Sequence, residues 1–548
     1  MATPETAPAP QNGVAHQDAP VTVASEPKKK LLGREFYRSL GSPKYIIAPM
    51  VDRSEFAWRM LTRSFLPPEE QKQILAYSPM YHARLFREQA NVRAQHFHPT
   101  RAAAGKEGDE SLFLDGNPAI DRPLFVQFCA NDPDDFLEAA RYVAPYCDAV
   151  DLNLGCPQGI AKRGHYGAFL QEDWDLIYKL INRLHNELPI PVTAKFRIQE
   201  TKEKTLEYAK MILSAGASII AVHGRRREQK GHNTGVADWS YIRYLRDNLP
   251  PETVIFANGN NLNYEDLDRC LEATGADAVM SAEGNLSDPS IFSKPPPVGS
   301  EGRDYWRGRD GKGGYRIDAM LRRYLDVLYK YVLEQPVPER KPLYLPSDPV
   351  EEPTQSLEAA EDEEDGPPKK KQKRAKHKRA TSPSLGVMQG HLFQLLRPMV
   401  SVHTDVRDAL ARSHPGDMPA FEHVLTLVEK AVKKGLQEYE QFPERFEPNP
   451  EEKLTGSKAT IAEYGRPFWV CQPHIRPLPE EAVEIGALTA KGAVTKKKAN
   501  GKTEDADTTG STPAAEASAT PGVTPGATSS GESKTVSALT TPDPLVSG

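Results

Sequence analysis

The sequence has few cysteines and no long apolar run, and these two absences exclude several classes of protein. Its 548 residues include five cysteines, an odd number with no Cys-x-x-Cys pair, so neither a disulfide framework nor a zinc site is indicated. No apolar stretch approaches the roughly 20 residues that a membrane-spanning helix needs. We therefore expect an intracellular protein with no membrane span and no bound metal.

Aromatic residues are missing from three segments, residues 1–27, 347–384 and 499–548. Such segments cannot bury enough apolar surface to offset the entropy of the chain, so we expect them to be disordered. The expected organisation is a disordered N-terminal tail (1–42), a barrel domain (43–300), a helical domain (301–346 and 385–445) interrupted by a disordered acidic and basic insert (347–384), an extended segment (446–498) and a disordered C-terminal tail (499–548).

Neither sign of charge dominates the chain. The 69 Lys and Arg against 75 Asp and Glu give a net charge of −6, which argues against a uniformly basic nucleic-acid binder but leaves local patches open. One such patch, Lys369 to Arg379 in the insert, resembles a nuclear import signal and could equally be a solvated charge cluster. We expect the protein in the cytoplasm, the nucleus or both.

Eight short apolar runs recur between residues 45 and 281, separated by loops or by segments with helical spacing. Near-continuous hydrophobicity is typical of strands that are buried on both faces. Eight strand–helix units over about 250 residues predict an α/β protein with a (β/α)8 TIM barrel. An open doubly wound sheet is the alternative, although no G-x-G-x-x-G motif follows an early strand. The predicted strands are 45–50, 76–80, 124–128, 149–154, 192–196, 219–223, 254–258 and 278–281, and helices are predicted at 134–143 and 174–184 between them.

Helical spacing continues after the barrel. Apolar stripes predict helices over 316–333 and 421–439, and a third over 388–411 with a kink near Pro398. The second of these helices carries Lys430, Lys433 and Lys434 on its polar side, which is either a solvated face or a surface for an RNA backbone.

Polar or reactive residues follow the predicted strands. In a barrel the carboxyl ends of all strands lie on one rim, where active sites are found. Polar residues that recur at these strand ends therefore indicate a site. The most informative stretch is Asn153-Leu-Gly-Cys156-Pro157-Gln158, which places a thiol in a loop directly after a strand. A lone cysteine is otherwise a small, buried apolar residue. The strand-end residues are Met50, Gln127, Asn153, Cys156, Lys195, Arg197, His223, Asn258 to Asn260 and Glu283.

These residue types suit flavin mononucleotide (FMN). Asn258-Gly259-Asn260 and Ala282-Glu283-Gly284 follow two late strands, where Gly-containing loops can surround a phosphate. Lys195 and His223 can place positive charge beside a ring that becomes anionic on reduction. Gln127 can offer both a donor and an acceptor to the edge of that ring.

Cys156 completes this chemistry. A thiol has an ordinary pKa of about 8.5, so near neutral pH it can donate a proton. Hydride addition to a conjugated double bond produces an enolate that needs such a proton on the neighbouring carbon. A flavin on one face of the substrate and a thiol on the other would reduce the bond.

With these motifs the chain resembles the tRNA-dihydrouridine synthases, most closely the eukaryotic branch that acts on D-loop positions 16 and 17. The resemblance covers the whole predicted barrel, and the matching stretches run in order along it. They are residues 48–50, 126–131, 153–170, 194–197, 222–225, 228–231, 256–260 and 279–285.

The resemblance implies an FMN enzyme that uses NADPH or NADH to reduce the C5=C6 bond of a uridine in tRNA. Hydride would pass from flavin N5 to C6, and Cys156 would donate a proton to C5. We expect a monomer whose partner is tRNA. The implied flavin contacts are Pro49, Met50, Val51, Gln127, Lys195, His223, Asn258, Gly259, Asn260, Ala282 and Glu283, and the implied substrate contacts are Asn153, Arg197, Lys162, Arg163 and Arg225.

Two other functions stay open at this point. An FMN barrel oxidoreductase acting on a free pyrimidine, similar to dihydroorotate dehydrogenase, would not need the helical domain. A barrel that has lost catalysis and only binds RNA would not need the complete flavin set or Cys156.

Overall fold

The computed structural model describes residues 30–349, 382–446 and 454–487. The C-terminal tail and most of the N-terminal tail and the insert, for which the sequence predicts disorder, lie outside the described residues. The basic run from Lys369 to Arg379 also lies outside them, so its role as an import signal stays a prediction.

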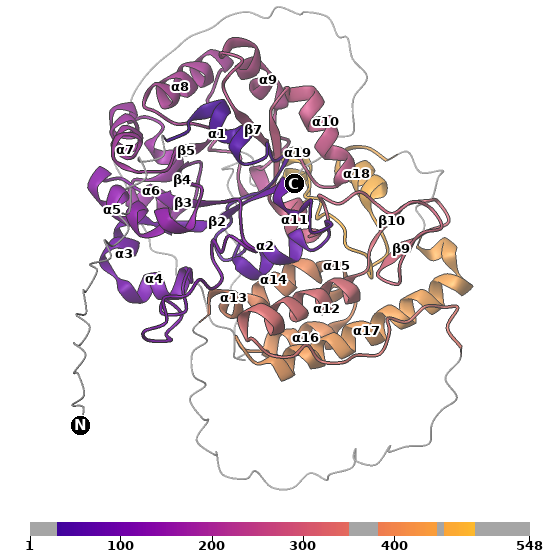
Figure 1. The fold of residues 1–548 in the computed structure, drawn as a ribbon. Helices are drawn as coiled ribbons and strands as arrows, with labels where there is room; N and C mark the ends of the chain where they lie inside the picture. Colours follow the sequence, from indigo (N-terminus) through magenta and orange to yellow (C-terminus); the bar gives the residue numbers. More distant parts are fainter. Residues whose placement is uncertain (1–29, 350–381, 447–453, 488–548) are drawn as a thin grey trace, which may run out of the picture.

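A closed barrel of eight parallel strands forms the N-terminal part of the fold (Figure 1). Each strand pairs with the next one, and the last pairs with the first, which confirms the (β/α)8 prediction and excludes the open doubly wound sheet. The strands are buried on both faces; all six residues of the fourth, for example, are buried. Their bounds are β1 Tyr45–Ile47, β2 Ile74–His82, β3 Leu124–Cys129, β4 Ala149–Leu154, β5 Val192–Arg197, β6 Ile220–His223, β7 Ile255–Asn258 and β8 Ala278–Ser281.

Local signals start and stop the helices that surround the barrel. Asp132 accepts hydrogen bonds from the N–H groups of Asp134 and Asp135 and so caps α5. Asn263 and Asp266 form a reciprocal capping box at the start of α10, which ends at Gly275 with φ 64°. The barrel helices are α2 Phe56–Arg63, α3 Ala83–Glu88, α4 Ala90–His96, α5 Pro133–Val143, α6 Gly159–Gly164, α7 Trp174–Glu187, α8 Lys202–Ser214, α9 Trp239–Asn248, α10 Tyr264–Thr274 and α11 Glu283–Ser287.

The predicted disordered tail is too long, because α1 (Gly33–Ser39) is ordered against the barrel. Phe36 and Tyr37 are buried, and the Phe36 ring stacks on Phe125 with centroids 5.9 Å apart. These two aromatic residues belong to a core cluster with the amino-terminal residues of the strands. Burial of two large rings offsets the entropy of ordering this short helix.

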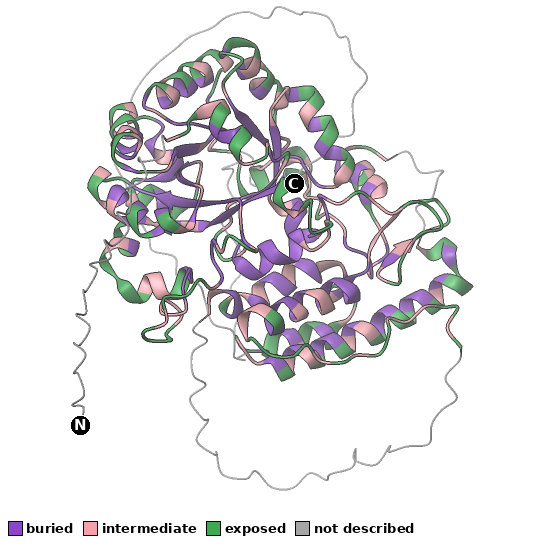
Figure 2. Cartoon of the chain, viewed as in Figure 1, coloured by how far each residue is buried: buried purple, intermediate pink, exposed green. Residues whose placement is uncertain are grey.

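A second apolar core joins α2 to the helical region (Figures 1 and 2). The predicted helix over 316–333 is confirmed as α12 (Ile317–Val327) with a π-helical extension (Leu328–Val332), and that over 421–439 as α17 (Met418–Gln441). The single kinked helix predicted over 388–411 is wrong. Proline is tolerated in the first turn of a helix but not in its interior, so the chain breaks at Leu396 and Pro398 lies in the first turn of a new helix. The short helices found instead are α13 Pro383–Gly386, α14 Met388–Leu395, α15 Arg397–Val400 and α16 Thr404–Arg412.

Residues 454–487, which we call the C-terminal strap, run back from the helical region onto the barrel. The sequence predicted an extended segment here, but the strap contains α18 (Gly456–Tyr464) and α19 (Pro479–Glu484). Trp469 is fully buried in the helical-region core, and the Cys471 N–H donates to Tyr315 O at 2.9 Å. Tyr315 lies in an unpredicted hairpin formed by β9 (Tyr305–Arg307) and β10 (Gly313–Tyr315).

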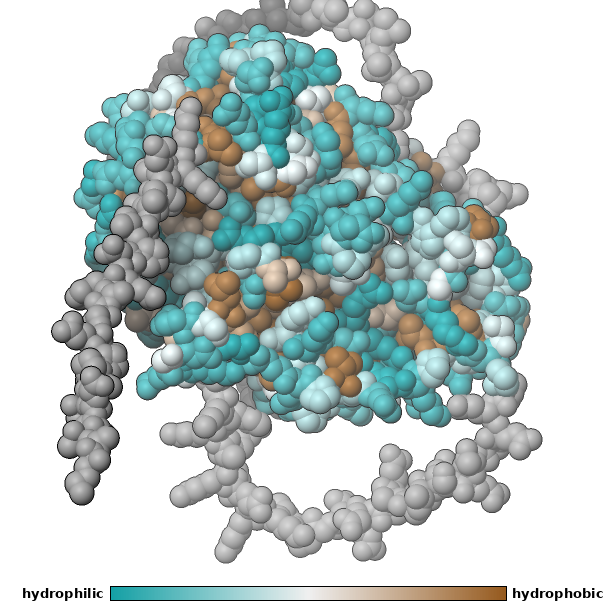
Figure 3. All heavy atoms as spheres, viewed as in Figure 1, coloured by the Kyte–Doolittle hydropathy of each residue, from teal (hydrophilic) through white to brown (hydrophobic). Residues whose placement is uncertain are grey.

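The face of the molecule in Figure 3 is mostly hydrophilic, with apolar side chains in small groups. Among the described residues, no helix has both the length and the apolar character that crossing a bilayer requires.

Candidate active site

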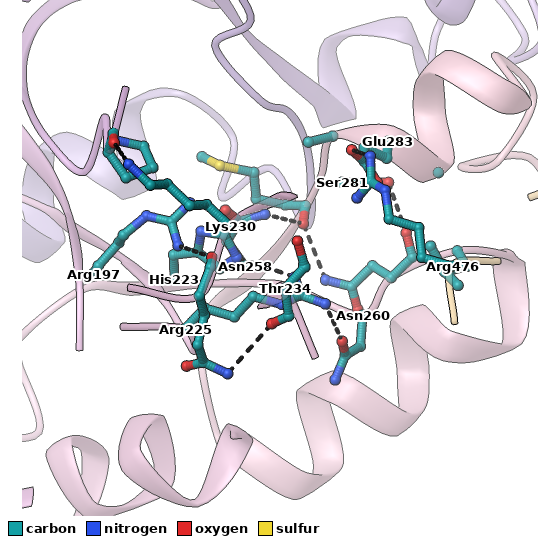
Figure 4. Close-up of a pocket in the computed structure, with 18 of the residues that line it drawn as sticks. Arg197, His223, Arg225, Lys230, Thr234, Asn258, Asn260, Ser281, Glu283 and Arg476 are labelled. Atoms are coloured by element: carbon teal, nitrogen blue, oxygen red, sulfur yellow. Dashed lines mark hydrogen bonds and ion pairs between the residues drawn. The ribbon is translucent and has the colours of Figure 1, made fainter. Parts of the chain in front are cut away.

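A cavity of about 420 Å³ opens where the barrel strands end (Figure 4). Its wall comes mainly from the loops that follow β6, β7 and β8, with Pro157 and Gln158 from the loop that follows β4. Barrel closure thus brings together residues that are widely separated in sequence. The predicted site residues that line it are Arg197, His223, Arg225, Asn258, Gly259, Asn260, Ala282 and Glu283.

The other predicted site residues do not line this cavity, and their roles stay predictions. Gln127, Asn153 and Lys195 lie on the neighbouring strands β3, β4 and β5, with Asn153 paired to Lys195. Lys162 and Arg163 are exposed on α6. Pro49, Met50 and Val51 lie on the loop after β1, where the Met50 N–H donates to Ser54 Oγ at 3.0 Å and Val51 is 54% exposed.

Cys156 does not itself line the cavity, but it directly precedes Pro157, which does, and it is held by its own loop. The side-chain oxygen of Asn153 accepts hydrogen bonds from the N–H groups of Gly155 at 3.0 Å and Cys156 at 2.9 Å. On the other side, Ala168 N–H donates to Cys156 O at 3.1 Å. Gly167 has φ +64°, and a Cβ there would lie 2.9 Å from Cys156 O, so this approach requires glycine. The loop therefore has little freedom to move the thiol.

Cys156 is also the one accessible thiol. All five cysteines lie among the described residues, and the other four are buried. Burial raises the pKa of the neighbouring Cys129 to about 12, which leaves that thiol unreactive. The thiol available for chemistry is therefore the one at the mouth of the barrel.

A chain of buried side chains runs beneath the Cys156 loop. Thr193 Oγ1 donates to Asp151 Oδ1 at 2.6 Å, and Gln127 Nε2 donates to Asp151 Oδ2 at 2.8 Å. Asn153 Nδ2 in turn donates to Gln127 Oε1 at 2.7 Å. Both ends of the Gln127 amide thus contact protein groups. The network orients the Asn153 amide, which in turn positions Cys156.

Two cations tie the Cys156 loop to the loop after β6. Arg197 Nε donates to Gly155 O at 2.8 Å, and its Nη1 donates to Arg226 O at 3.1 Å. Lys230 Nζ donates to Pro157 O at 2.6 Å. These bonds hold the two loops together at one side of the cavity.

Burial and mutual repulsion lower the pKa values of the basic groups at the mouth. The pKa of Lys195 falls to about 8 through burial and the nearby Arg197, opposed by Asp151, and that of Arg197 falls to about 10 through burial. Within the described residues the Lys195 ammonium makes no hydrogen bond or ion pair, so it can accept a ligand acceptor.

The expectation that His223 contributes positive charge is wrong. Burial and the neighbouring Arg197, Lys195 and Arg225 hold the pKa of His223 well below its usual range. The imidazole is therefore neutral near pH 7, and its Nε2 lies 3.2 Å from Arg225 Nη1. Since the guanidinium can only donate, Nε2 is the acceptor of this contact. His223 can offer a hydrogen bond at the cavity wall, and the charge comes from its neighbours.

The loops after β7 and β8 form the opposite end of the cavity. Gly259 has φ +115°, and a Cβ there would lie 2.6 Å from Ala237 Cβ, so the backbone turns in a way that other residues would not permit. Arg225 is 3% exposed and donates from Nη2 to Asn260 Oδ1 at 2.9 Å and to Gly235 O at 3.0 Å. Its side chain thus lies with these loops inside the cavity wall, away from the outer surface where RNA contact was expected.

The arrangement fits FMN. The cavity has a cationic end with a glycine-dependent turn, as a phosphate requires. At the other side the neutral imidazole of His223 lines the cavity, and the half-buried ammonium of Lys195, on the neighbouring strand β5, has no partner among the described residues, so both can meet the polar edge of a flavin ring. Across the described part of the chain, no group of His, Cys, Asp or Glu has the arrangement of a metal site.

Asp151 and Arg476 are among the residues of the site that were not predicted. Asp151 is fully buried, and burial raises its pKa to about 6, partly offset by its hydrogen bonds to Thr193 and Gln127. A lone carboxylate inside an apolar strand was a signal that could have found it. Arg476, which enters the cavity from the C-terminal strap, has no such signal, because its segment shows no periodic pattern.

Comparisons with known proteins match the chain to one family. The family model described as dihydrouridine synthase (Dus) matches residues 46–302. A tRNA-dihydrouridine(16/17) synthase of Schizosaccharomyces pombe is 43% identical over 477 residues, covering 86% of this chain and 98% of that protein. The Saccharomyces cerevisiae protein of the same name is 42% identical over 455 residues, covering 82% of this chain and 88% of that protein.

A relative named for other tRNA positions matches less of the chain. The tRNA-dihydrouridine(20a/20b) synthase of Saccharomyces cerevisiae is 30% identical over 279 residues, covering 49% of this chain and 69% of that protein. The similarity to the 16/17 proteins therefore extends over a larger share of this chain.

Proposed function

Because the chain belongs to the dihydrouridine synthase family, we propose that it reduces uridines at D-loop positions 16 and 17 of tRNA to dihydrouridine. The family expected from the motifs is confirmed. The position is supported by the two yeast 16/17 synthases, whose similarity covers more than four-fifths of this chain. Their names also specify NAD(P)(+), which supports NADPH or NADH as the reductant.

The cavity at the barrel mouth would hold FMN. Asn258 to Asn260, Ala282 and Glu283 would surround its ribityl phosphate, and Lys195 and His223 would contact the ring. When bound there and reduced by NAD(P)H, FMN would supply the hydride for uracil C6. The loop after β1 would also contact the flavin ring, through Pro49, Met50 and Val51.

Cys156 would donate the proton that completes the reduction. The thiol stands at the cavity edge on a loop that Asn153, Gly167 and Ala168 hold in place. A donor fixed in this way loses little freedom when the base arrives, and proton transfer from a positioned group contributes about 10²–10⁴-fold to rate. The observation that carries the proposal is that the only cysteine not buried directly precedes Pro157, which lines the cavity.

The remaining charges would bind RNA. Arg197 lines the cavity beside the Cys156 loop, and it would contact the uracil together with Asn153. Lys162 and Arg163 are exposed on α6, directly after that loop, where they can meet phosphates of a tRNA whose uridine has left the stack.

The test is reduction of unmodified tRNA by the purified full chain with NADPH and FMN, followed by mapping of dihydrouridine. We expect the product at positions 16 and 17 only, and a flavin that copurifies with the protein. Reduction of free uracil or orotate would support the free-pyrimidine alternative. A colourless protein that binds tRNA without reducing it would support the non-catalytic one.

A further inference from the structure

Arg476 reaches the cavity from a part of the chain that lies far beyond the barrel. Its Nη2 donates to Glu283 Oε1 at 2.5 Å, across 193 residues of sequence, and it lines the same cavity as Asn258 to Asn260 (Figure 4). The contact therefore brings a guanidinium from the C-terminal strap to the end of the cavity formed by the loops after β7 and β8.

Glu283 poses an electrostatic problem at this end. It belongs to one of the two predicted phosphate loops, and its Oε2 is buried without a hydrogen-bond partner in the described residues. A carboxylate facing a phosphate is repulsive unless a cation lies between the two. A guanidinium has five N–H donors, so pairing with Glu283 is compatible with further hydrogen bonds to phosphate oxygens.

We propose that Arg476 binds the phosphate of FMN and that Glu283 holds its guanidinium in place. This inference rests on the proposed function, because it needs FMN in the cavity. It makes the C-terminal strap part of the cofactor site, although the strap lies outside the barrel in both sequence and fold.

The strap is anchored on both sides of Arg476. Before it, Tyr464 OH donates to Asp266 Oδ1 at 3.0 Å on α10, and Ile317 N–H donates to Trp469 O at 2.9 Å on α12. After it, α19 packs against the short helix Gly231–Asn233, in the loop that follows β6. The residues between these anchors must therefore pass along the edge of the cavity.

Two other cations that line the cavity, Arg225 and Lys230, bond mainly to groups of the loops. Arg225 donates to Gly235 O and Asn260 Oδ1, and Lys230 donates to Pro157 O. Their charge attracts an anion, but their bonds mainly hold loops together. Arg476 is bound by a carboxylate of the expected phosphate site itself, which orients the guanidinium there.

Because anchoring and phosphate binding share one residue, each should stabilise the other. A ligand that binds more tightly when the strap is in its observed position stabilises the strap there by its difference in affinity. FMN should therefore stabilise this position, and riboflavin, which has the same ring and ribityl chain without the phosphate, should not.

The test compares FMN with riboflavin on deflavinated protein, with dissociation constants taken from flavin fluorescence. Arg476→Ala should weaken FMN binding by about 10–100-fold, the usual effect of losing a charge-assisted hydrogen bond, and riboflavin binding by less than about threefold. Arg476→Lys should restore part of the FMN affinity. Lys458→Ala, which removes an exposed charge from the same strap, is the matched control and should change neither constant.

The outcomes distinguish failure of the Arg476 assignment from failure of the proposed function. Equal weakening of FMN and riboflavin by Arg476→Ala would overturn the assignment of Arg476 and leave the proposed function standing. Unchanged FMN binding with weaker tRNA binding would also overturn it, in favour of an RNA phosphate. Failure of the unaltered protein to bind FMN would overturn the proposed function as well.

Hydrogen exchange supplies a second measurement that does not depend on substitution. FMN should slow exchange of backbone amides in residues 472–478, and riboflavin should leave it near the rate of the deflavinated protein. Equal protection by the two flavins would contradict the role of the phosphate.

Discussion

The two ends of the cavity are built in different ways. At the thiol end, Cys156 is positioned by Asn153 and Ala168, which lie in the same loop region, 3 and 12 residues from it in sequence, and bond directly to its backbone. At the opposite end, Glu283 meets Arg476 from the C-terminal strap, and the two are 193 residues apart. Local backbone geometry places the proton donor, whereas tertiary closure completes the cofactor end.

This difference implies that chemistry and cofactor retention can be lost separately. Changes at the thiol end should slow reduction of tRNA while the flavin stays bound. Changes at the opposite end should release flavin while the thiol keeps its position. The predictions below test this separation, beginning with the largest effect.

Alkylation of the native protein should have the largest effect. Cys156 is the only cysteine that is not buried, so iodoacetamide should modify it alone. We expect tRNA reduction to fall by at least about 10²-fold, the size of a proton-transfer contribution, with bound FMN and NADPH oxidation retained. Peptide mapping identifies the modified residue. Full inactivation with the label on another cysteine would show that the thiol end is assigned to the wrong residue.

Asn153→Ala should come next. It removes the acceptor of the Gly155 and Cys156 N–H groups, so the thiol loop gains freedom. We expect tRNA reduction at saturating substrate to fall about 10–100-fold and the dissociation constant of FMN to change by less than about threefold. Asn186→Ala, an exposed change on α7, is the control and should have no effect. Loss of FMN from Asn153→Ala would mean that the two ends are not independent.

Lys195 should make FMN affinity depend on pH. Its pKa is lowered from 10.5 to about 8, so the ammonium is present below about pH 8 and is lost as pH rises through that value. We expect FMN binding to weaken by about tenfold across this range, since a charge-assisted hydrogen bond is lost. Lys195→Met should bind FMN weakly at every pH, with no step near 8, whereas Lys210→Met on the exterior of α8 should retain the step. Titration of flavin fluorescence at a series of pH values measures the FMN affinity of both variants. If Lys195→Met kept the change in FMN affinity near pH 8, that change would belong to another titrating group.

Lys162→Ala and Arg163→Ala should have the smallest effects. Each removes an exposed charge from α6. Loss of one phosphate contact should weaken tRNA binding by about threefold at moderate salt. It should also reduce the slope of log binding constant against log salt concentration by about one. Lys179→Ala, an exposed change on α7, is the control. Salt-dependent filter binding provides the measurement, and an unchanged slope would place the RNA elsewhere.

The barrel and its thiol loop were predictable from the sequence because their signals are local. Each strand is a short apolar run, and the Cys156 loop follows one of them directly. The polar residues at the strand ends share a rim only because the strands are parallel, which the repeated strand–helix pattern already implied.

The rest depended on contacts that sequence spacing does not encode. The neutral state of His223 arises from burial among three cations, two from the neighbouring strand β5 and one from the loop that follows β6. Helix α1 is ordered because Phe36 and Tyr37 pack into the barrel core, although the sequence predicted that their segment belongs to a disordered tail. The position of Arg476 depends on anchors in both the helical region and the barrel, so no local pattern could reveal it.

The most direct test of the central claim is a single-turnover experiment on the proton donor. FMN-loaded Cys156→Ala and unaltered protein are reduced by one equivalent of NADPH without oxygen and mixed with unmodified tRNA, and reoxidation of the flavin is followed. We predict equal reduction by NADPH and reoxidation by tRNA about 10²–10⁴-fold slower in the variant, with Cys270→Ala behaving as unaltered protein. Reoxidation of Cys156→Ala at the unaltered rate would contradict the account.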